Sequence, residues 1–133
     1  MLTICDTHIL LFWADAPHRL SATAKEAVES GIETESLACS DISLWEIAML
    51  YTRGRINNQA GISSQAYLED IISAMNLSVL PITAEIAELS QRDTFVHGDP
   101  ADRLIAATAL AHRTQLITAD EKLRSIPELR CVW

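Results

Sequence analysis

Five acidic residues stand where carboxylates could do chemistry together. They are Asp6, Glu46, Asp99, Asp102 and Asp120. Two of them open the stretch GDPADRLIAATAL, which is otherwise rich in small and apolar residues, and the other three lie beside or within apolar runs far away in the chain. Carboxylates gathered without matching basic residues need a cation, and oxygen-only ligation suits Mg²⁺ or Mn²⁺. The leading hypothesis is therefore metal-assisted phosphoryl chemistry.

Each acid also has an ordinary structural interpretation. Asp6 could cap the helix that follows it, and Asp120 could cap the short segment EKLRS. Asp99 precedes Pro100, which suits an N-cap followed by proline at the first helical position, and Asp102 would then stand at the third. Glu46 is different, because an unpaired carboxylate amid apolar neighbours is costly, so its structural alternative is an ion pair with an arginine.

The elements that must position these acids alternate between apolar runs and helix-like segments. Strands are expected at 2–5, 36–40, 77–82, 115–118 and 130–132. Helices are expected at 8–13, 22–30, 42–53, 63–76, 83–93 and 99–110, with a turn or short helix after Asp120. Alternation of this kind predicts one α/β domain over residues 1–133, a three-layer α/β/α sandwich with a central, mostly parallel sheet of four to five strands. Its carboxyl-end edge should collect Asp6, Asp41 and Asp120.

Local signals refine this outline. Ser21 and Asp41 are expected to be N-caps, and Gly31 is expected to end the second helix as its C′ residue. The segment from Ile42 to Tyr51 is apolar nearly all round, so we expect the sheet to cover part of it and a second subunit in a two-fold homodimer to cover the rest.

Composition sets further bounds. The chain has 133 residues, 49% of them hydrophobic, which suffices for the core of one domain. No apolar run approaches the roughly 18 residues that span a membrane, so a cytoplasmic protein without membrane contact is expected. The three cysteines share no metal-binding spacing and are expected to be buried, reduced thiols.

The net charge of −8 argues against nucleic-acid binding, unless several acids share one site where a divalent ion inverts the local charge. Eight of the ten basic residues are arginine, which is the better partner for bidentate phosphate contacts.

Four motifs occur in an order that resembles a known family. They are DTHILLFW from Asp6, SLWEIAML around Glu46, GDPADRLIAATAL from Gly98, and LITADEKL around Asp120. Together they resemble the PIN domain, in particular the toxin ribonucleases of VapC type, over essentially the whole chain. The family's four acids match Asp6, Glu46, Asp102 and Asp120, and Asp99 matches an extra acid of some members.

The resemblance implies Mg²⁺- or Mn²⁺-dependent cleavage of RNA, a homodimer, and inhibition by a cognate antitoxin. The four matched acids would hold the metal, which can activate a water for in-line attack, so no protein nucleophile is required. Thr7 and Thr118 could hydrogen-bond a carboxylate or a water. Arg103, Arg55 and Arg53 are candidates for phosphate contacts, with surface salt bridges as the alternative for each.

Other classes fit the sequence less well. A receiver-type signalling domain would need an adjacent acidic pair after the first strand, but Cys5 precedes Asp6, and a haloacid-type phosphatase would need D-x-D, but Thr7 and His8 follow it. A catalytically silent interaction module would have lost some of the acids. Among the histidines only His97, close to Asp99, is a candidate for the site.

Overall fold

A five-stranded parallel sheet forms the centre of the protein, whose computed structural model describes residues 1–56, 61–93, 95 and 98–133. The strands are β1 (Thr3–Cys5), β2 (Leu37–Ser40), β3 (Ser78–Leu80), β4 (Leu116–Ile117) and β5 (Cys131–Val132). Their spatial order is β3-β2-β1-β4-β5, and every neighbouring pair is parallel. The expected parallel α/β architecture is therefore confirmed.

The strand order places β1 at the centre and makes it a switch point. The chain passes from β1 outward through β2 to β3, then returns to the other side of β1 to form β4 and β5. Ile4 is paired with Ala38 on one side and with Leu116 on the other. Open α/β sheets bind their ligands outside the carboxyl ends of the strands at such a reversal. The expected site therefore lies just beyond β1.

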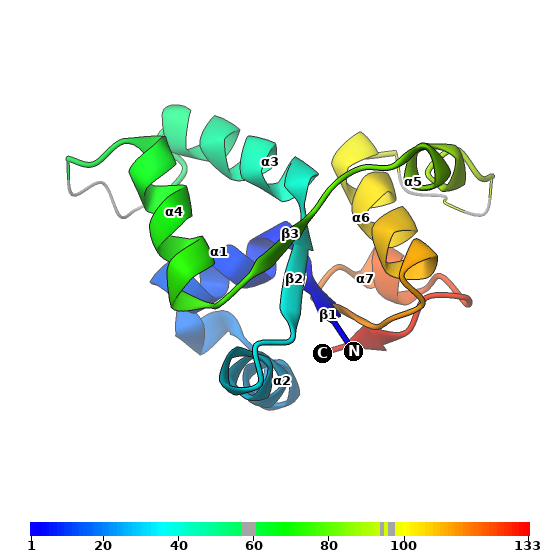
Figure 1. The fold of residues 1–133 in the computed structure, drawn as a ribbon, viewed down its shortest axis with the longest axis horizontal. Helices are drawn as coiled ribbons and strands as arrows, with labels where there is room; N and C mark the ends of the chain where they lie inside the picture. The colour runs from blue at the N-terminus through cyan, green and yellow to red at the C-terminus, as the bar shows by residue number, and fades with distance from the viewer. Residues whose placement is uncertain (57–60, 94, 96–97) are drawn as a thin grey trace.

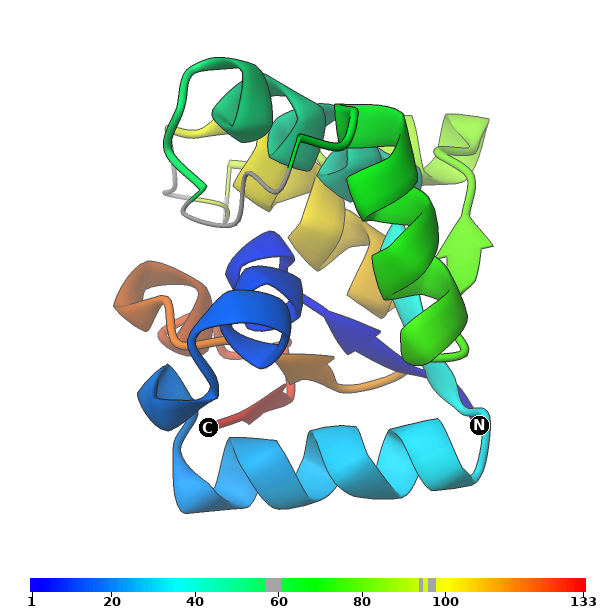
Figure 2. The ribbon, with the colours of Figure 1, turned by 90° about the vertical axis from the view of Figure 1, so that its left-hand side faces the viewer.

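Helices cover both faces of the sheet (Figures 1 and 2). They are α1 (Thr7–Asp15), the 3-10 helix η1 (Pro17–Arg19), α2 (Ala22–Glu33), α3 (Asp41–Thr52), α4 (Ser64–Ala74), α5 (Ala84–Leu89), α6 (Pro100–Ala111) and α7 (Glu121–Arg124). Figure 1 shows α1 and α4 on one side of the sheet, and α5, α6 and α7 on the other. Figure 2 shows α1 lying between α2 and α3.

Two apolar clusters, one on each face, hold the three layers together. Cys5, Cys39 and Ile117 face the cluster that includes residues of α1, α2 and α4. Their strand neighbours Ile4 and Leu116 face the cluster built on α5, α6 and α7. Consecutive strand residues point to opposite faces, and here both faces are covered, so short runs of only apolar residues suffice.

Several helix starts follow the expected capping chemistry, with one correction. Ser21 accepts a hydrogen bond from the backbone N–H of Ala24, as expected. Asp41, however, is the first residue of α3 and not its cap. The hydroxyl of Ser40 accepts from the N–H of Ile42 instead, at 3.2 Å. The carboxylate of Asp41 turns toward β3 and accepts from the N–H of Ile82 at 3.3 Å, so it does not join the other acids.

The expected end of the second helix at Gly31 is wrong, because α2 continues to Glu33. Glu35 takes the left-handed conformation after the helix, with φ of 53°. Gly31 is instead needed for close packing, since a Cβ added there would lie 2.4 Å from a methyl carbon of Leu37. The glycine lets α2 lie directly against β2.

The α3 helix is only partly covered by the rest of the chain. Ser43 and Ile47 are its buried residues, whereas the Trp45 side chain is 59% exposed.

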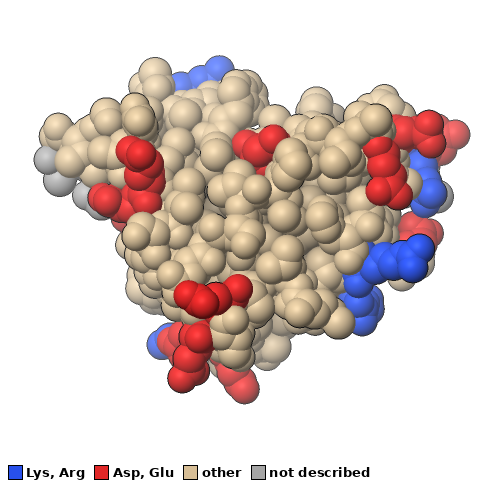
Figure 3. Space-filling view, viewed as in Figure 1, with Lys and Arg blue, Asp and Glu red and all other residues tan. Residues whose placement is uncertain are grey.

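On the face shown in Figure 3, acidic side chains lie in several separate groups with much uncharged surface between them. Among the described residues, no helix is long and apolar enough to cross a membrane.

The cysteines are not joined in disulfides. Cys5 and Cys39 are buried, as expected, but Cys131 is only partly buried. Burial raises the pKa of Cys5 well above its usual range, raises that of Cys39 to about 12, and raises that of Cys131 to about 11. Thiols with such pKa values stay protonated near neutral pH, so they are poor nucleophiles and metal ligands.

Candidate active site

All five acids singled out in the sequence line one cavity of about 230 Å³ at the carboxyl end of the sheet. Its wall consists of Asp6, Glu46, Asp99, Asp102 and Asp120, together with His8, Phe12 and Ala119. Asp6 follows β1, Asp120 follows β4, Glu46 lies on α3, and the remaining two acids open α6. Four segments far apart in the sequence thus deliver carboxylates to the predicted edge of the sheet.

Asp6 is fixed in place by two hydrogen bonds. Its side chain is 4% exposed. It accepts one hydrogen bond from the backbone N–H of Thr7 at 2.8 Å and another from the hydroxyl of Thr118 at 2.8 Å. The same Thr118 hydroxyl accepts from the backbone N–H of Asp120 at 3.0 Å. Thr118 therefore links the two acids that follow the neighbouring strands β1 and β4. This role is the one expected for Thr118, to hydrogen-bond a carboxylate.

Three other acids form a tighter group. One carboxylate oxygen each from Glu46, Asp99 and Asp102 lies within 4.8 Å of the other two. Asp99 is also the N-cap of α6, because it accepts from the backbone N–H of Ala101 at 2.9 Å. The Oε1 atom of Glu46 is buried and has no hydrogen-bond partner. A buried carboxylate oxygen left in this way is costly unless something else satisfies it.

Burial raises the pKa of both Asp6 and Glu46. For Asp6 desolvation is the largest cause, the charge of Asp120 adds to it, and the Thr118 hydrogen bond and nearby His8 act in the opposite direction. For Glu46 desolvation is again the largest cause; the Thr7 hydrogen bond and His8 oppose it, and the charges of Asp6 and Asp99 add to it. In the protein alone, then, the ionised form of each acid is disfavoured, and a bound cation would favour it.

The donor set fits a hard divalent cation. The five acids offer only oxygen atoms, and the described part of the cavity wall contributes no cysteine or lysine. Glu46 has one unsatisfied oxygen, and its carboxylate lies close to two others. Mg²⁺ and Mn²⁺ prefer such ligands. The residues present therefore fit this class of metal.

Neither Thr7 nor Arg103 lines the cavity. Thr7 is fully buried, and its hydroxyl lies 2.9 Å from that of Ser43. Its side chain also hydrogen-bonds Glu46, so it joins α1 to α3 and holds a carboxylate, as expected. Arg103 donates from Nε to the carbonyl of Ser90 at 2.8 Å and from Nη2 to the carbonyl of Arg92 at 3.3 Å. Its guanidinium ties α6 to the end of α5 and is not among the residues that line the cavity.

The other candidates fall in different places. Arg53 is exposed at the C-cap of α3, and Arg55 lines a separate cavity beside the site. His97 lies outside the described residues. Two wall residues, His8 and Phe12, did not stand out in the sequence. Only their position in the sequence could have indicated that they line the site, because they lie two and six residues after Asp6 on the helix that Asp6 caps.

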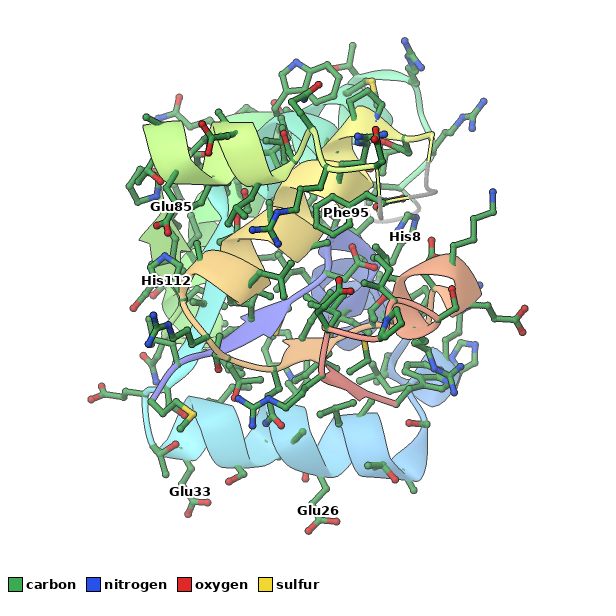
Figure 4. The ribbon with its side chains drawn as sticks, turned by 90° about the vertical axis from the view of Figure 1, so that its right-hand side faces the viewer. His8, Glu26, Glu33, Glu85, Phe95 and His112 are labelled. Carbon is green, nitrogen blue, oxygen red and sulfur yellow. The ribbon has the colours of Figure 1, made fainter. Side chains whose placement is uncertain are left out.

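Figure 4 shows the end of the sheet at which the site lies. His8 and Phe95 lie there, whereas His112 lies at the opposite end of α6. Phe95 is 2% exposed and packs in the cluster that contains the buried residues of α6. It thus helps to hold α6, which carries Asp99 and Asp102, against the rest of the domain.

The sheet order, the two helical layers and the acid cavity together define a known class. The PIN domain family model matches residues 3–129, and the chain belongs to this family. It is 36% identical over 123 residues to Ribonuclease VapC22 of Mycobacterium tuberculosis, with 92% of this chain and 89% of that protein covered. Membership of this family sets aside the receiver and haloacid classes considered from the sequence.

Solved structures share the fold. VapBC2 of Rickettsia felis, bound to a DNA fragment from its promoter, matches with a TM-score of 0.71 and 22% identity, covering 98% of this chain and 97% of that one. A toxin-antitoxin complex from Klebsiella pneumoniae matches with a TM-score of 0.63 and 23% identity, covering 96% and 94%.

Proposed function

We propose that this protein is a metal-dependent endoribonuclease, the toxin of a toxin–antitoxin pair. The observation that carries the proposal is the meeting of five carboxylates from four distant segments around one cavity, with a buried Glu46 oxygen that lacks a partner. Its relative from M. tuberculosis is called a ribonuclease, and other relatives form toxin–antitoxin complexes. A catalytically silent module would have no reason to keep all five acids together.

The residues divide into ligands and supports. Asp6, Glu46, Asp102 and Asp120 would hold Mg²⁺ or Mn²⁺, and Asp99 joins Glu46 and Asp102 closely enough to share in this. A bound ion would supply charge neutralisation for the phosphodiester and activation of an attacking water. Thr118 fixes the orientation of Asp6, so that this ligand is positioned before substrate arrives. The described wall carries no hydroxyl or thiol nucleophile, consistent with direct attack by water.

The partners follow from the exposed side of α3. A shallow, largely apolar cavity of about 390 Å³ lies between this helix and the start of α6, lined in part by Ile42, Trp45, Met49 and Leu104. We propose that a second copy of the chain covers it in a two-fold homodimer, and that a cognate antitoxin binds the toxin and inhibits it. The cytoplasm, where RNA is translated, is the proposed place of action.

Cleavage assays test the enzymatic proposal. Purified protein without antitoxin should cut members of a broad RNA panel in Mg²⁺ or Mn²⁺ and should stop when the metal is chelated. Asp6→Asn and Asp120→Asn should each reduce cleavage by a factor of 100 or more, on the order of what loss of a metal ligand or its support produces. An intact RNA panel in both metals would refute the proposal.

A further inference from the structure

A second cavity, of about 280 Å³, adjoins the acid cavity and has the opposite charge. The two share His8 and Phe12, so they are neighbours on either side of these α1 side chains. The second is also lined by Arg19 and Arg55, and Asp15 is the acid among its described residues. On a chain with a net charge of −8, two arginines and a histidine facing one hollow are a local exception.

Two of the basic groups in this cavity lie beside one aromatic ring. The Arg19 guanidinium carbon lies 4.4 Å from the centroid of the Phe12 ring, a cation–π contact that orients it. His8 lies beside the same ring, with the two ring centroids 6.1 Å apart. Arg55 comes from the opposite wall, where its backbone N–H bonds the carbonyl of Leu50 at 2.9 Å after α3 ends.

The acid among the described lining residues, Asp15, is already engaged. A carboxylate oxygen of Asp15 accepts a hydrogen bond from the hydroxyl of Tyr67, a partly buried contact between α1 and α4. The pKa of Tyr67 is raised well above its usual range by burial and by Asp15, so the phenol remains the donor. Asp15 therefore serves to join these helices; its carboxylate still offsets the charge of one arginine, and the second arginine leaves the described lining with an excess of positive charge.

We propose that Arg19 and Arg55 bind a backbone phosphate next to the scissile one, so that the RNA strand runs from the acid cavity past His8 into the basic cavity. This inference rests on the proposed function and adds the path that the RNA strand takes over the surface. A metal held by the acids would neutralise the phosphate that reacts, whereas the same acids would repel the neighbouring phosphates. The adjoining arginines are placed to accept one of those neighbours through planar, bidentate hydrogen bonds.

The experiment compares charge-removing variants with RNA that lacks a single charge. Arg19→Gln, Arg55→Gln and the double variant are assayed beside Arg113→Gln, whose residue follows α6 next to His112, at the opposite end of that helix from the acid cavity (Figure 4). Each enzyme cleaves an oligonucleotide series with one neutral methylphosphonate linkage at each position around the cut. Arg19→Lys is included because it keeps the charge and loses the fork of donors.

We expect each single variant to raise KM about tenfold and the double variant to raise it up to about a hundredfold, with kcat nearly unchanged, since each lost charged hydrogen bond is worth about tenfold. Arg113→Gln should match the wild type, and Arg19→Lys should fall between the wild type and Arg19→Gln. One neutral linkage beside the cut should slow the wild type by about the same factor, and should not slow the double variant further.

Failure of the proposed function and failure of this inference give different results. Absence of cleavage by the wild type would remove the proposed function and this inference with it. Cleavage by the wild type, with an unchanged KM in the double variant or with additive effects of neutral linkages, would overturn this inference alone. Normal cleavage by a double variant that escapes inhibition by the antitoxin would also overturn it, because the basic cavity would then bind protein and not RNA. Matching melting curves must show that the variants fold.

Discussion

Replacing Glu46 with glutamine should stabilise the protein when no metal is present. The change keeps the shape of the side chain and removes its charge from a group of three carboxylates whose oxygens lie within 4.8 Å of one another. It also places an amide that can donate a hydrogen bond beside acids that can accept one. In the wild type the buried Oε1 atom has no partner, and burial already disfavours the ionised form of Glu46.

The size of the effect follows from the spacing. Two unit charges 4.8 Å apart repel by about 3.5 kcal/mol at an effective dielectric of about 20. Asp99 is exposed, so solvent screens its share, and partial protonation reduces the total further. We therefore expect a net gain of about 1 to 3 kcal/mol for Glu46→Gln, which corresponds to a rise in Tm of roughly 3 to 15 °C for a domain of this size.

Paired thermal melts in chelator and in Mg²⁺ measure this gain and its reversal. The wild type should gain about 2.7 kcal/mol when Mg²⁺ is present at about 100 times its Kd, whereas Glu46→Gln has lost a ligand and should gain less. Glu26→Gln is the matched control, since Glu26 projects from α2 away from the site (Figure 4) and should respond to Mg²⁺ like the wild type. A destabilised Glu46→Gln in chelator, or equal Mg²⁺ shifts in all three proteins, would refute the reasoning.

Three further predictions concern other parts of the fold. Asp6→Asn should make the free energy of unfolding in chelator depend less on pH at the acid end. The raised pKa of Asp6 means that the folded wild type binds more protons than the unfolded chain. Wild-type stability should therefore fall as pH rises from about 4 toward that raised pKa. Urea unfolding from pH 4 to 7 checks this, and equal slopes would contradict it. Gly31→Ala should destabilise the fold by about 1 to 3 kcal/mol in urea melts, because its Cβ would meet Leu37, and the same change should cost less when made in a Leu37→Ala background. Trp45→Glu should convert the proposed homodimer to a monomer by light scattering, and an unchanged mass would place the interface elsewhere.

The layer structure could be predicted from the sequence because its signals are local and agree with one another. Short apolar runs and capped helices alternate, and the structure has a parallel strand for each expected run. Boundaries were less certain. The expected helix at 83–93 ends at Leu89, and Gly31 lies inside α2, since glycine serves close packing as well as helix ends. The pattern carries no sign of the Leu37 side chain that requires the glycine.

The candidate site was predictable in its acids but not in its surroundings. Asp6 and Asp120 could be placed because they directly follow strands, and parallel strands end at one edge. The contacts of Arg103 could not be predicted, because helical position cannot tell which carbonyls a guanidinium will meet, and here it donates to the carbonyls of Ser90 and Arg92. His8 was missed for the converse reason: only the packing of α1 turns it toward the cavity.

The central position of β1 also bears on how the protein is made. Within this domain Asp6 is synthesised well before its partners, since Thr118 and Asp120 come more than a hundred positions later. The first half of the chain can pair β1 with β2 but must leave the other edge of β1 open until β4 arrives. Such long-range pairing forms late. A nascent or truncated chain that lacks β4 therefore carries no complete acid cavity, so the cavity is completed only when synthesis of the domain is nearly finished.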